Sequence, residues 1–588
     1  MAGQRLSVTR RTVLRGAVAA GAMAGAVAAG AATPTAARAE TGRRVAVLGG
    51  GVAGLTAAHE LAERGFEVTV YERRALGGKA RSIAVPGTGK DGRPELWGEH
   101  GFRFFPGFYR HIPDTMRRIP FAGNANGVWD NLVAAPEARF SRQGADDTLI
   151  PMGKFGKVWS TPADFRETVG SAIATSTSMG TADALYFANR LLVFNTSCDA
   201  RRYGQWDQMS WRDYVGAGKR SNEFRMLLSR TLTTLLVAAK EDKASTLTIG
   251  TMGEQFLGNP LEVANDGALD RLLNGATNEA WIDPWVNRLR DLGVTFVNAE
   301  VKGLELEGSR ISGARVVDSA GSAQTVAADY FVSALPVEVA RTLWTPEILS
   351  LRPELAGMNQ LTVDWMTGIQ FFLRRPTDIA RGHVAYVDSP WSLTSISQGQ
   401  FWNRTPVTGL GDGTVQDCLS VDISDWNTPG MLYGKTAKEC THEEIAREVW
   451  AQLQAHLNDR ADLLRDEDLH SWFLDTGVAW DAAQQRNTNA DPLLINTAGS
   501  WVLRPESHHA ALENLFLAGD YVRTNVDLAT MEGASEAART AVNKILDVSG
   551  SDAARCKLFT LYRAVELEPF RQLDVQRFAA GQPNMFDA

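Results

Sequence analysis

The sequence predicts an α/β fold with more than one hydrophobic core. A strand, a glycine-rich turn, a helix and a second strand follow one another between Val45 and Glu72. A second apolar run, residues 515–518, ends in Gly519 and Asp520 and indicates another buried strand far along the chain. The 588 residues, 44% hydrophobic and 22% charged, are enough for two or more cores.

The first 39 residues have the composition of a removable signal peptide. Arg10 and Arg11 precede an Ala/Gly-rich apolar run over residues 16–32, and Ala37-Arg38-Ala39 fits a cleavage site between small residues. Residues 9–14 are similar to a twin-arginine signal, which predicts export and a secreted or extracytoplasmic protein. An uncleaved membrane anchor is the alternative. Twin-arginine export carries folded, cofactor-loaded proteins, so we expect a tightly bound cofactor.

Charge and cysteine content narrow the classes of partner. The leader contains five Arg and no acid, so its removal takes the formal charge from −8 to −13, which argues against nucleic acid as a partner. None of the four cysteines forms a C-x-x-C pair, so no zinc or iron–sulfur metal site is expected. The sequence is compatible either with a disulfide or with four buried thiols.

The unit from Val45 to Glu72 has the order that a dinucleotide-binding site requires. Gly49 allows a tight turn, Gly51 lets a pyrophosphate approach the backbone, and Gly54 lets the helix pack on the strand. The helix start offers free N–H groups to phosphates, and Glu72, 18 residues after Gly54, can accept hydrogen bonds from ribose hydroxyls. We expect dinucleotide contacts from Gly49, Gly51, Val52, Ala53, Gly54 and Glu72.

The segment after Glu72 points to the kind of dinucleotide. Arg73 is followed by Gly77-Gly78-Lys79-Ala80-Arg81-Ser82. An acid, a double glycine, a cation and a Ser in this order resemble the second motif of the flavin amine-oxidase and phytoene-desaturase superfamily. The resemblance implies that Gly78 approaches FAD closely and that Arg73, Lys79 and Arg81 lie near its phosphates and flavin. A solvated Gly-Gly turn is the alternative.

Two later segments extend the resemblance to the middle and end of the chain. In that superfamily, a valine at the position of Val301 contacts the adenine, and an acid at the position of Asp520, after Gly519, bonds the ribitol chain. NAD has no ribitol, so this motif favours FAD. The resemblance further implies that the helix that opens near Met531 points at the flavin N1–C2=O edge, where its dipole would stabilise negative charge. Residues 529–534, A-T-M-E-G-A, are closer to carotenoid desaturases than to monoamine oxidases.

The resemblance implies a Rossmann-like FAD-binding domain that is discontinuous in sequence, with an inserted α+β substrate domain. The FAD-binding domain is expected from residues 43–120, 281–340 and 501–548. The substrate domain is expected from residues 121–280 and 341–500, where residues 224–239 predict a buried helix and scattered tryptophans suit an apolar pocket. Residues 549–588 predict a C-terminal helical tail, amphipathic and packed on the body. Transient membrane contact of this tail is an alternative against which its acidic residues argue.

Residues 97–109 resemble a phytoene-desaturase segment that runs along the flavin and lines the substrate tunnel. This chain has Arg103 where those proteins have His, so an inherited catalytic role is in doubt. Arg103 is a candidate to anchor a substrate anion, to stabilise reduced flavin or to form a structural ion pair. His100 and Tyr109 are candidate acid–base groups, with structural roles open for both. Hydride transfer to a flavin needs no strong protein base.

Together these features predict an exported FAD-dependent oxidoreductase that takes hydride from an organic substrate. The residues of these motifs favour a desaturase or dehydrogenase with an apolar, terpenoid or lipid-like substrate. Hydroxysqualene dehydroxylases share similar motifs. Oxygen or a quinone would then accept the electrons. One alternative is an amine or amino-acid oxidase that releases hydrogen peroxide, and another is a non-catalytic flavin-binding protein. The sequence does not indicate an oligomeric state.

Overall fold

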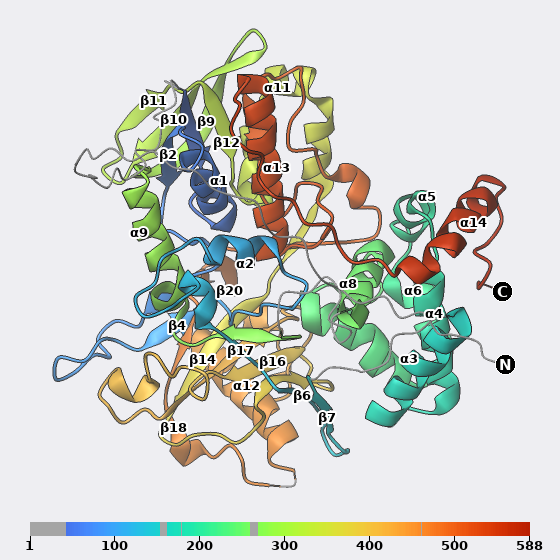
Figure 1. Ribbon diagram of the computed structural model, residues 1–588. Coiled ribbons are helices and arrows are strands. Elements are labelled where there is room, and N and C mark those ends of the chain that lie inside the picture. Colours follow the sequence, from blue (N-terminus) through green and yellow to red (C-terminus); the bar gives the residue numbers. More distant parts are fainter. Residues whose placement is uncertain (1–42, 153–160, 178, 259–267, 460, 588) are drawn as a thin grey trace, which may run out of the picture. The chain divides into compact units, whose positions relative to one another are not determined.

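The computed structural model describes residues 43–152, 161–177, 179–258, 268–459 and 461–587 (Figure 1). The predicted signal peptide lies outside these residues. None of the helices within them is long and apolar enough to cross a membrane. All four cysteines lie in these ranges, and each is a buried free thiol.

A seven-stranded sheet gathers strands from three distant parts of the chain. Its order is β11-β10-β9-β2-β1-β12-β22, and the strands from β9 to β22 run parallel where they pair. The antiparallel strands β10 and β11 extend one side. The strands are β1 (Arg44–Leu48), β2 (Glu67–Glu72), β9 (Thr295–Glu307), β10 (Arg310–Asp318), β11 (Ala323–Val326), β12 (Tyr330–Ser333) and β22 (Leu515–Leu517).

Helices cover both faces of this sheet, which explains why its central strands are continuous apolar runs. Val45 and Val47 of β1 pack in one core, and Ala46 and Leu48 pack in another. The first core contains residues of α1 (Val52–Ala62), α9 (Asp283–Asp291) and α13 (Met531–Ser549). The second contains residues of α10 (Val337–Ala340) and α11 (Pro346–Leu351). Figure 1 shows α13, in red, alongside α1, in blue.

A second seven-stranded sheet has one apolar face and one mixed face. Its order is β18-β14-β17-β16-β15-β6-β7, with β15 and β6 parallel and all other pairs antiparallel. The apolar face packs on α12 (His442–Leu457). The strands are β6 (Glu137–Ser141), β7 (Thr148–Pro151), β14 (Thr367–Leu373), β15 (Gly382–Tyr386), β16 (Leu393–Ser397), β17 (Asp417–Ile423) and β18 (Leu469–Leu474).

Four helical segments pack around a further core. They are α3 (Pro162–Ser176), α4 (Thr181–Asn195), the π-helical η4 (Arg225–Leu235) and α8 (Thr246–Gly258). Residues 224–239, predicted as a buried helix, are largely helical in the structure, and residues 225–235 form a π-helix. Leu227 and Leu228 are buried there, whereas Leu232 and Leu236 are half-buried and face the cavity described below.

The C-terminal tail differs from the amphipathic helix that the sequence predicts. Its helices are η13 (Val565–Leu567) and α14 (Glu568–Ala579), so Leu558, Leu561 and Tyr562 lie before them in irregular backbone. The backbone N–H and C=O of Tyr562 bond to the side-chain amide of Gln255 in α8, at 3.0 and 2.9 Å. The pairing with α8 replaces the hydrogen bonds that a helix would make at Tyr562.

Candidate functional site

The carboxyl ends of four parallel strands meet at one cavity of about 950 Å³. Strands β1 and β12 lead directly into Gly49 and Ala334, β2 ends at Glu72, and Gly519 is the second residue after β22. All four residues line the cavity. Parallel strands place their carboxyl ends on one sheet edge, and α/β proteins bind ligands there. The motifs from the start, middle and end of the chain are therefore neighbours in space.

The glycines of the first turn are required by close backbone approaches. Gly49 has a φ of 108°, and a Cβ there would lie 2.7 Å from the carbonyl oxygen of Ala334. A Cβ on Gly54 would lie 1.9 Å from the carbonyl oxygen of Gly49. Gly54 thus packs the helix against the turn and does not itself line the cavity, whereas Gly51, Val52 and Ala53 do.

The helix start and Glu72 present hydrogen-bonding groups to this part of the cavity. Gly51 is the N-cap residue of α1, and no described side chain caps the helix. The first N–H groups of α1 are therefore available to an anion. The Glu72 carboxylate accepts the backbone N–H groups of Gly50 and Arg74, each at 2.8 Å. These bonds hold the acid beside the glycine turn while leaving lone pairs for a ribose.

The double-glycine segment packs directly on the first turn. Gly77 donates its backbone N–H to the Gly50 carbonyl at 2.9 Å, and Gly78, with a φ of 59°, would place a Cβ 3.0 Å from the Gly51 Cα. Lys79 forms an ion pair with Glu338 at 3.6 Å. Arg81 donates to the Gly78 carbonyl. These bonds fix both cations at the cavity wall.

Asp491 is a cavity residue that the sequence did not reveal. It accepts a bidentate pair of hydrogen bonds from Arg74 at 2.9 and 2.5 Å and lies 3.5 Å from Arg81. Burial alone would raise the pKa of Asp491, but these arginines, led by Arg74, lower it. Asp491 stands in a loop with no motif around it, so only the fold brings it to the site.

The remaining predicted cofactor residues also reach the cavity. Arg73 pairs with Glu300 at 3.5 Å, next to Val301 in β9. Gly519 and Asp520 follow β22, and Met531 is the first residue of α13. The Thr530 hydroxyl caps α13 by accepting the Gly533 N–H at 3.1 Å. The helix that was expected to face the flavin therefore begins at the cavity.

Two of the candidate catalytic residues are held by protein partners. His100 lines the cavity, and its Nδ1 lies 2.6 Å from Asp475 Oδ2. Tyr109 is buried and forms a side-chain hydrogen bond with Thr530. Burial, and then the charge of Glu532, raise the pKa of the Tyr109 hydroxyl. Tyr109 is thus positioned as a neutral hydrogen-bonding group at the start of α13.

Arg103, the third candidate, is buried with little direct pairing. Its Nη2 lies 4.0 Å from Glu99 Oε2, and the side chain is 10% exposed. Neither Nε nor Nη2 bonds any described residue. Burial lowers the pKa of Arg103, and nearby Glu99 and Asp422 raise it. Of its three proposed roles, an ion pair with Glu99 is present at the limit of contact distance.

The far part of the cavity is an apolar chamber. Its wall comes from α3, α4, η4 and α8, and includes Val169, Phe187, Leu191, Leu232, Met252 and Phe256. Among the tryptophans of the inserted segments, Trp211 lines the cavity, whereas Trp206 and Trp391 pack in the cores and do not line it. The arrangement joins a nucleotide-sized polar end to an apolar end that can hold a lipid-like molecule.

This chain matches a known protein family and is similar to known proteins in sequence and in structure. The family described as flavin containing amine oxidoreductase matches residues 52–546. Zeta-carotene desaturase from Synechocystis sp. is 23% identical over 538 residues, which cover 86% of this chain and 97% of that protein. 15-cis-Phytoene desaturase from Synechococcus elongatus is 25% identical over 353 residues, which cover 59% of this chain and 69% of that protein. Carotenoid phi-ring synthase from Chlorobaculum tepidum is 24% identical over 297 residues, and the match spans 42% of its length.

Solved structures with the same fold include amine oxidases. Putrescine oxidase bound to putrescine superposes with a TM-score of 0.55 at 13% identity, covering 86% of this chain and 99% of that one. Cyclohexylamine oxidase from Brevibacterium oxydans gives a TM-score of 0.55 at 14% identity over the same shares. At this identity the likeness establishes the fold and leaves the substrate open.

Proposed function

Because the chain belongs to the family of flavin-containing amine oxidoreductases and is an FAD-dependent oxidoreductase, we propose that it dehydrogenates an apolar, lipid-like substrate. The observation that carries this proposal is the single cavity whose polar end holds the nucleotide motifs and whose other end is walled by apolar helices. The carotenoid desaturases among its relatives support the same direction.

The chain's own residues fit FAD in a Rossmann-like mode. The backbone of Gly49 and Gly51, with the start of α1, would hold the pyrophosphate, and Glu72 would bond the adenosine ribose. Asp520 and the start of α13 line the same cavity, where Asp520 would bond the ribitol chain and the helix start would face the flavin edge. When bound, FAD supplies the acceptor for the substrate hydride. The protein aligns the substrate and excludes water from the cavity.

The test is anaerobic reduction of the purified holoprotein. We expect loss of the visible flavin bands with members of a terpenoid and lipid panel and no loss with an amine and amino-acid panel. Readmission of oxygen or a quinone should restore the bands and identify the acceptor. Bleaching by amines with release of hydrogen peroxide would overturn the substrate class. A flavin that no compound reduces would indicate a non-catalytic protein.

We further propose export through the twin-arginine pathway. The support is Arg10-Arg11 followed by a weakly apolar run and a small-residue cleavage site. Replacing both arginines by lysine should retain the precursor in the cytoplasm, as measured by cell fractionation. Export that continues unchanged in this variant would contradict the proposal.

A further inference from the structure

Five residues of the cavity wall carry buried polar atoms that bond nothing else in the described chain. We name them the polar pocket cluster: Arg103 (Nε and Nη2), Asp270 (Oδ1), His383 (Nε2), Thr394 (Oγ1) and Asp422 (Oδ1). A buried polar atom without a partner costs about 1–3 kcal/mol, and folded proteins generally avoid it. Such atoms gathered on one cavity therefore indicate that a ligand supplies the partners.

The second sheet brings three of these side chains to one face. Thr394 lies opposite Asp422 in the β16–β17 register, and Ala385, two residues after His383, lies opposite Thr394. Side chains alternate along a strand, so His383, Thr394 and Asp422 share the face turned away from α12. Asp422 also packs on the loop before Arg103, since a Cβ on Gly101 would lie 2.8 Å from its Oδ1.

His383, a residue of the cavity wall, is oriented by a carboxylate, and its other nitrogen bonds no described residue. Its Nδ1 lies 2.6 Å from Asp270 Oδ2. A carboxylate accepts, so this bond favours the tautomer that carries its proton on Nδ1, in which Nε2 is an acceptor. The rings of Phe102 and Phe104 pack against the imidazole at centroid distances of 5.1 and 5.0 Å. The cluster thus offers one well-oriented acceptor between apolar walls.

The charges of the cluster favour a neutral ligand group. Arg103 faces Glu99, Asp422 and Asp475, so a substrate carboxylate or phosphate would meet these acids. An ammonium group would meet the Arg103 guanidinium in a buried site. Burial raises the pKa of Asp422 to about 7, so this carboxyl group is partly protonated near neutral pH. A hydroxyl can accept from Arg103 and donate to His383, which matches the free donors and acceptor.

We infer that the polar pocket cluster binds a hydroxyl group on an otherwise apolar substrate and selects it over the hydrocarbon of the same skeleton. The inference rests on the proposed function, because it takes the rest of the substrate to occupy the apolar end of the cavity. Arg103 and His383 are then residues that determine specificity by contacting the substrate oxygen.

The experiment compares three C20 polyprenyl ligands of one skeleton: the alcohol, the hydrocarbon and the primary amine. Each is titrated into the holoprotein, and binding is followed by the shift of the flavin bands and by quenching of tryptophan fluorescence, since Trp211 lines the cavity. We expect the alcohol to bind about 10- to 100-fold more tightly than the hydrocarbon, as for one or two hydrogen bonds to charged groups. The amine should bind less tightly than the alcohol.

Variants separate the oxygen contact from general packing. Arg103→Met and His383→Phe should weaken alcohol binding to the level of the hydrocarbon and leave hydrocarbon binding unchanged. Thr394→Val tests the same contact with a minimal change in shape. Its matched control is Ser395→Ala on the opposite face of β16, where the hydroxyl bonds Tyr386 at 2.9 Å. This control should leave the preference for the alcohol intact.

The outcomes are distinguishable from failure of the proposed function. Equal affinity for alcohol and hydrocarbon, or equal loss of both in the variants, would overturn the hydroxyl site and leave the apolar substrate class standing. Tightest binding of the amine would also overturn it. If neither the alcohol nor the hydrocarbon binds, the apolar substrate class fails, and the inference fails with it.

Discussion

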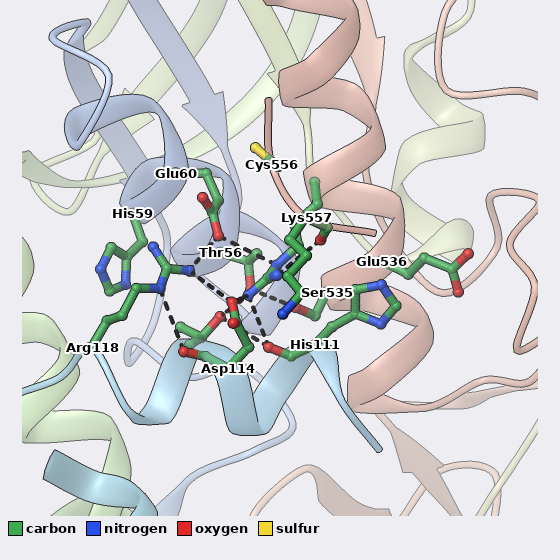
Figure 2. Close-up of polar contacts among 12 residues, drawn as sticks. Thr56, His59, Glu60, His111, Asp114, Arg118, Ser535, Glu536, Cys556 and Lys557 are labelled. Carbon is green, nitrogen blue, oxygen red and sulfur yellow. Dashed lines mark hydrogen bonds and ion pairs between the residues drawn. The ribbon is translucent and has the colours of Figure 1, made fainter. Parts of the chain in front are cut away.

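Two buried regions of this protein are rich in charge and differ in how their polar atoms are bonded. One lies behind the nucleotide turn, between α1, α13 and α2 (His111–Met116), and we call Glu60, Asp114, Arg118 and Arg539 the α1–α13 network. Figure 2 shows Glu60, Asp114 and Arg118 grouped between α1 and α2. The other region is the polar pocket cluster.

In the α1–α13 network every charge meets protein partners. Arg539 Nη2 donates to Asp114 Oδ2 and Thr115 Oγ1, both at 2.8 Å, and to the His111 carbonyl at 2.9 Å. Its Nε forms an ion pair with Glu60 Oε1 at 3.3 Å but makes no hydrogen bond within the described chain, and Arg539 does not line the cavity. Burial alone would raise the pKa of Glu60, but Arg539, Arg118 and Arg64 together lower it. Paired charges of this kind hold the two helices in place behind the cofactor turn.

The polar pocket cluster leaves buried donors and acceptors unbonded in residues that line a cavity. The difference teaches that burial and charge do not by themselves identify a functional site. The bonding state of each polar atom does: atoms bonded within the protein support the fold, and unbonded atoms on a cavity are available to a ligand. Substitutions in the two regions should therefore have opposite effects on stability.

The largest effect is expected when a cation is removed from the α1–α13 network. Arg539→Met would leave the buried carboxylate of Glu60 and the half-buried carboxylate of Asp114 without one partner, and we expect the free energy of unfolding to fall by about 3–5 kcal/mol. Denaturant unfolding followed by circular dichroism measures it. The control is Arg447→Met on α12, because Arg447 is 66% exposed and its pair with Glu443 should contribute under about 1 kcal/mol. Equal stability of the two variants would contradict the role of the network.

A substitution in the polar pocket cluster is expected to raise the free energy of unfolding, by an amount that depends on pH. Burial raises the pKa of Asp422 from 3.8 to about 7, against the charge of Arg103 and the Phe102 N–H, and Glu99 adds to the rise. Between about pH 4 and about pH 7, the Asp422 carboxyl group has lost its proton in the unfolded chain but keeps it in the folded chain. The free energy of unfolding therefore falls as the pH rises through this range. Asp422→Asn should remove this loss.

The expected difference between Asp422→Asn and the parent protein is about 4 kcal/mol at pH 8 and close to zero at pH 4. The variant should be the more stable protein at pH 8, because an amide needs no ionisation. Denaturant titrations at a series of pH values measure it. A difference that is the same at pH 5 and pH 8 would show that Asp422 titrates normally.

A smaller loss of stability is expected where α13 is bonded to the start of α2. Glu532, in the first turn of α13, accepts the backbone N–H groups of Arg110 and His111 at 2.7 Å and of Ile112 at 3.0 Å. Glu532→Gln replaces one acceptor by a donor facing these groups, at an expected cost of about 1–3 kcal/mol. Glu443→Gln, in the exposed first turn of α12, should change thermal and denaturant stability little. Comparable losses in both variants would argue against the tie.

The two regions also differ in how far their residues could be predicted from the sequence. The turn from Gly49 to Gly54 and the acid Glu72 were predictable because their chemistry is local: glycine spacing, a helix start and a strand end within one unit. The FAD motifs around Val301 and Asp520 were found through resemblance. Family membership confirms the flavin, while the contacts of individual residues stay predictions.

The hydroxyl-binding candidates were not predictable, because sheet register brings them together. Asp270, His383 and Asp422 come from three separate segments, and none has a motif around it. The tail is helical only from Val565 onward, and its earlier part differs from the prediction for a related reason. Apolar spacing around Leu561 favours a helix, but the backbone of Tyr562 is bonded to Gln255 of α8. In both cases a non-local partner decides the outcome.

The smallest expected effect gives the sharpest comparison, since it concerns two hydroxyls on neighbouring residues of β16. Thr394 Oγ1 is buried without a bond to the described chain, whereas Ser395 bonds Tyr386. Thr394→Val should leave the free energy of unfolding unchanged or raise it by up to about 1 kcal/mol, because it removes an unbonded polar atom. Ser395→Ala should lower it by about 1 kcal/mol, because it leaves the Tyr386 hydroxyl without its partner. Paired denaturation curves measure both, and a clear loss of stability in Thr394→Val would place that hydroxyl with the structural bonds and remove it from the ligand site.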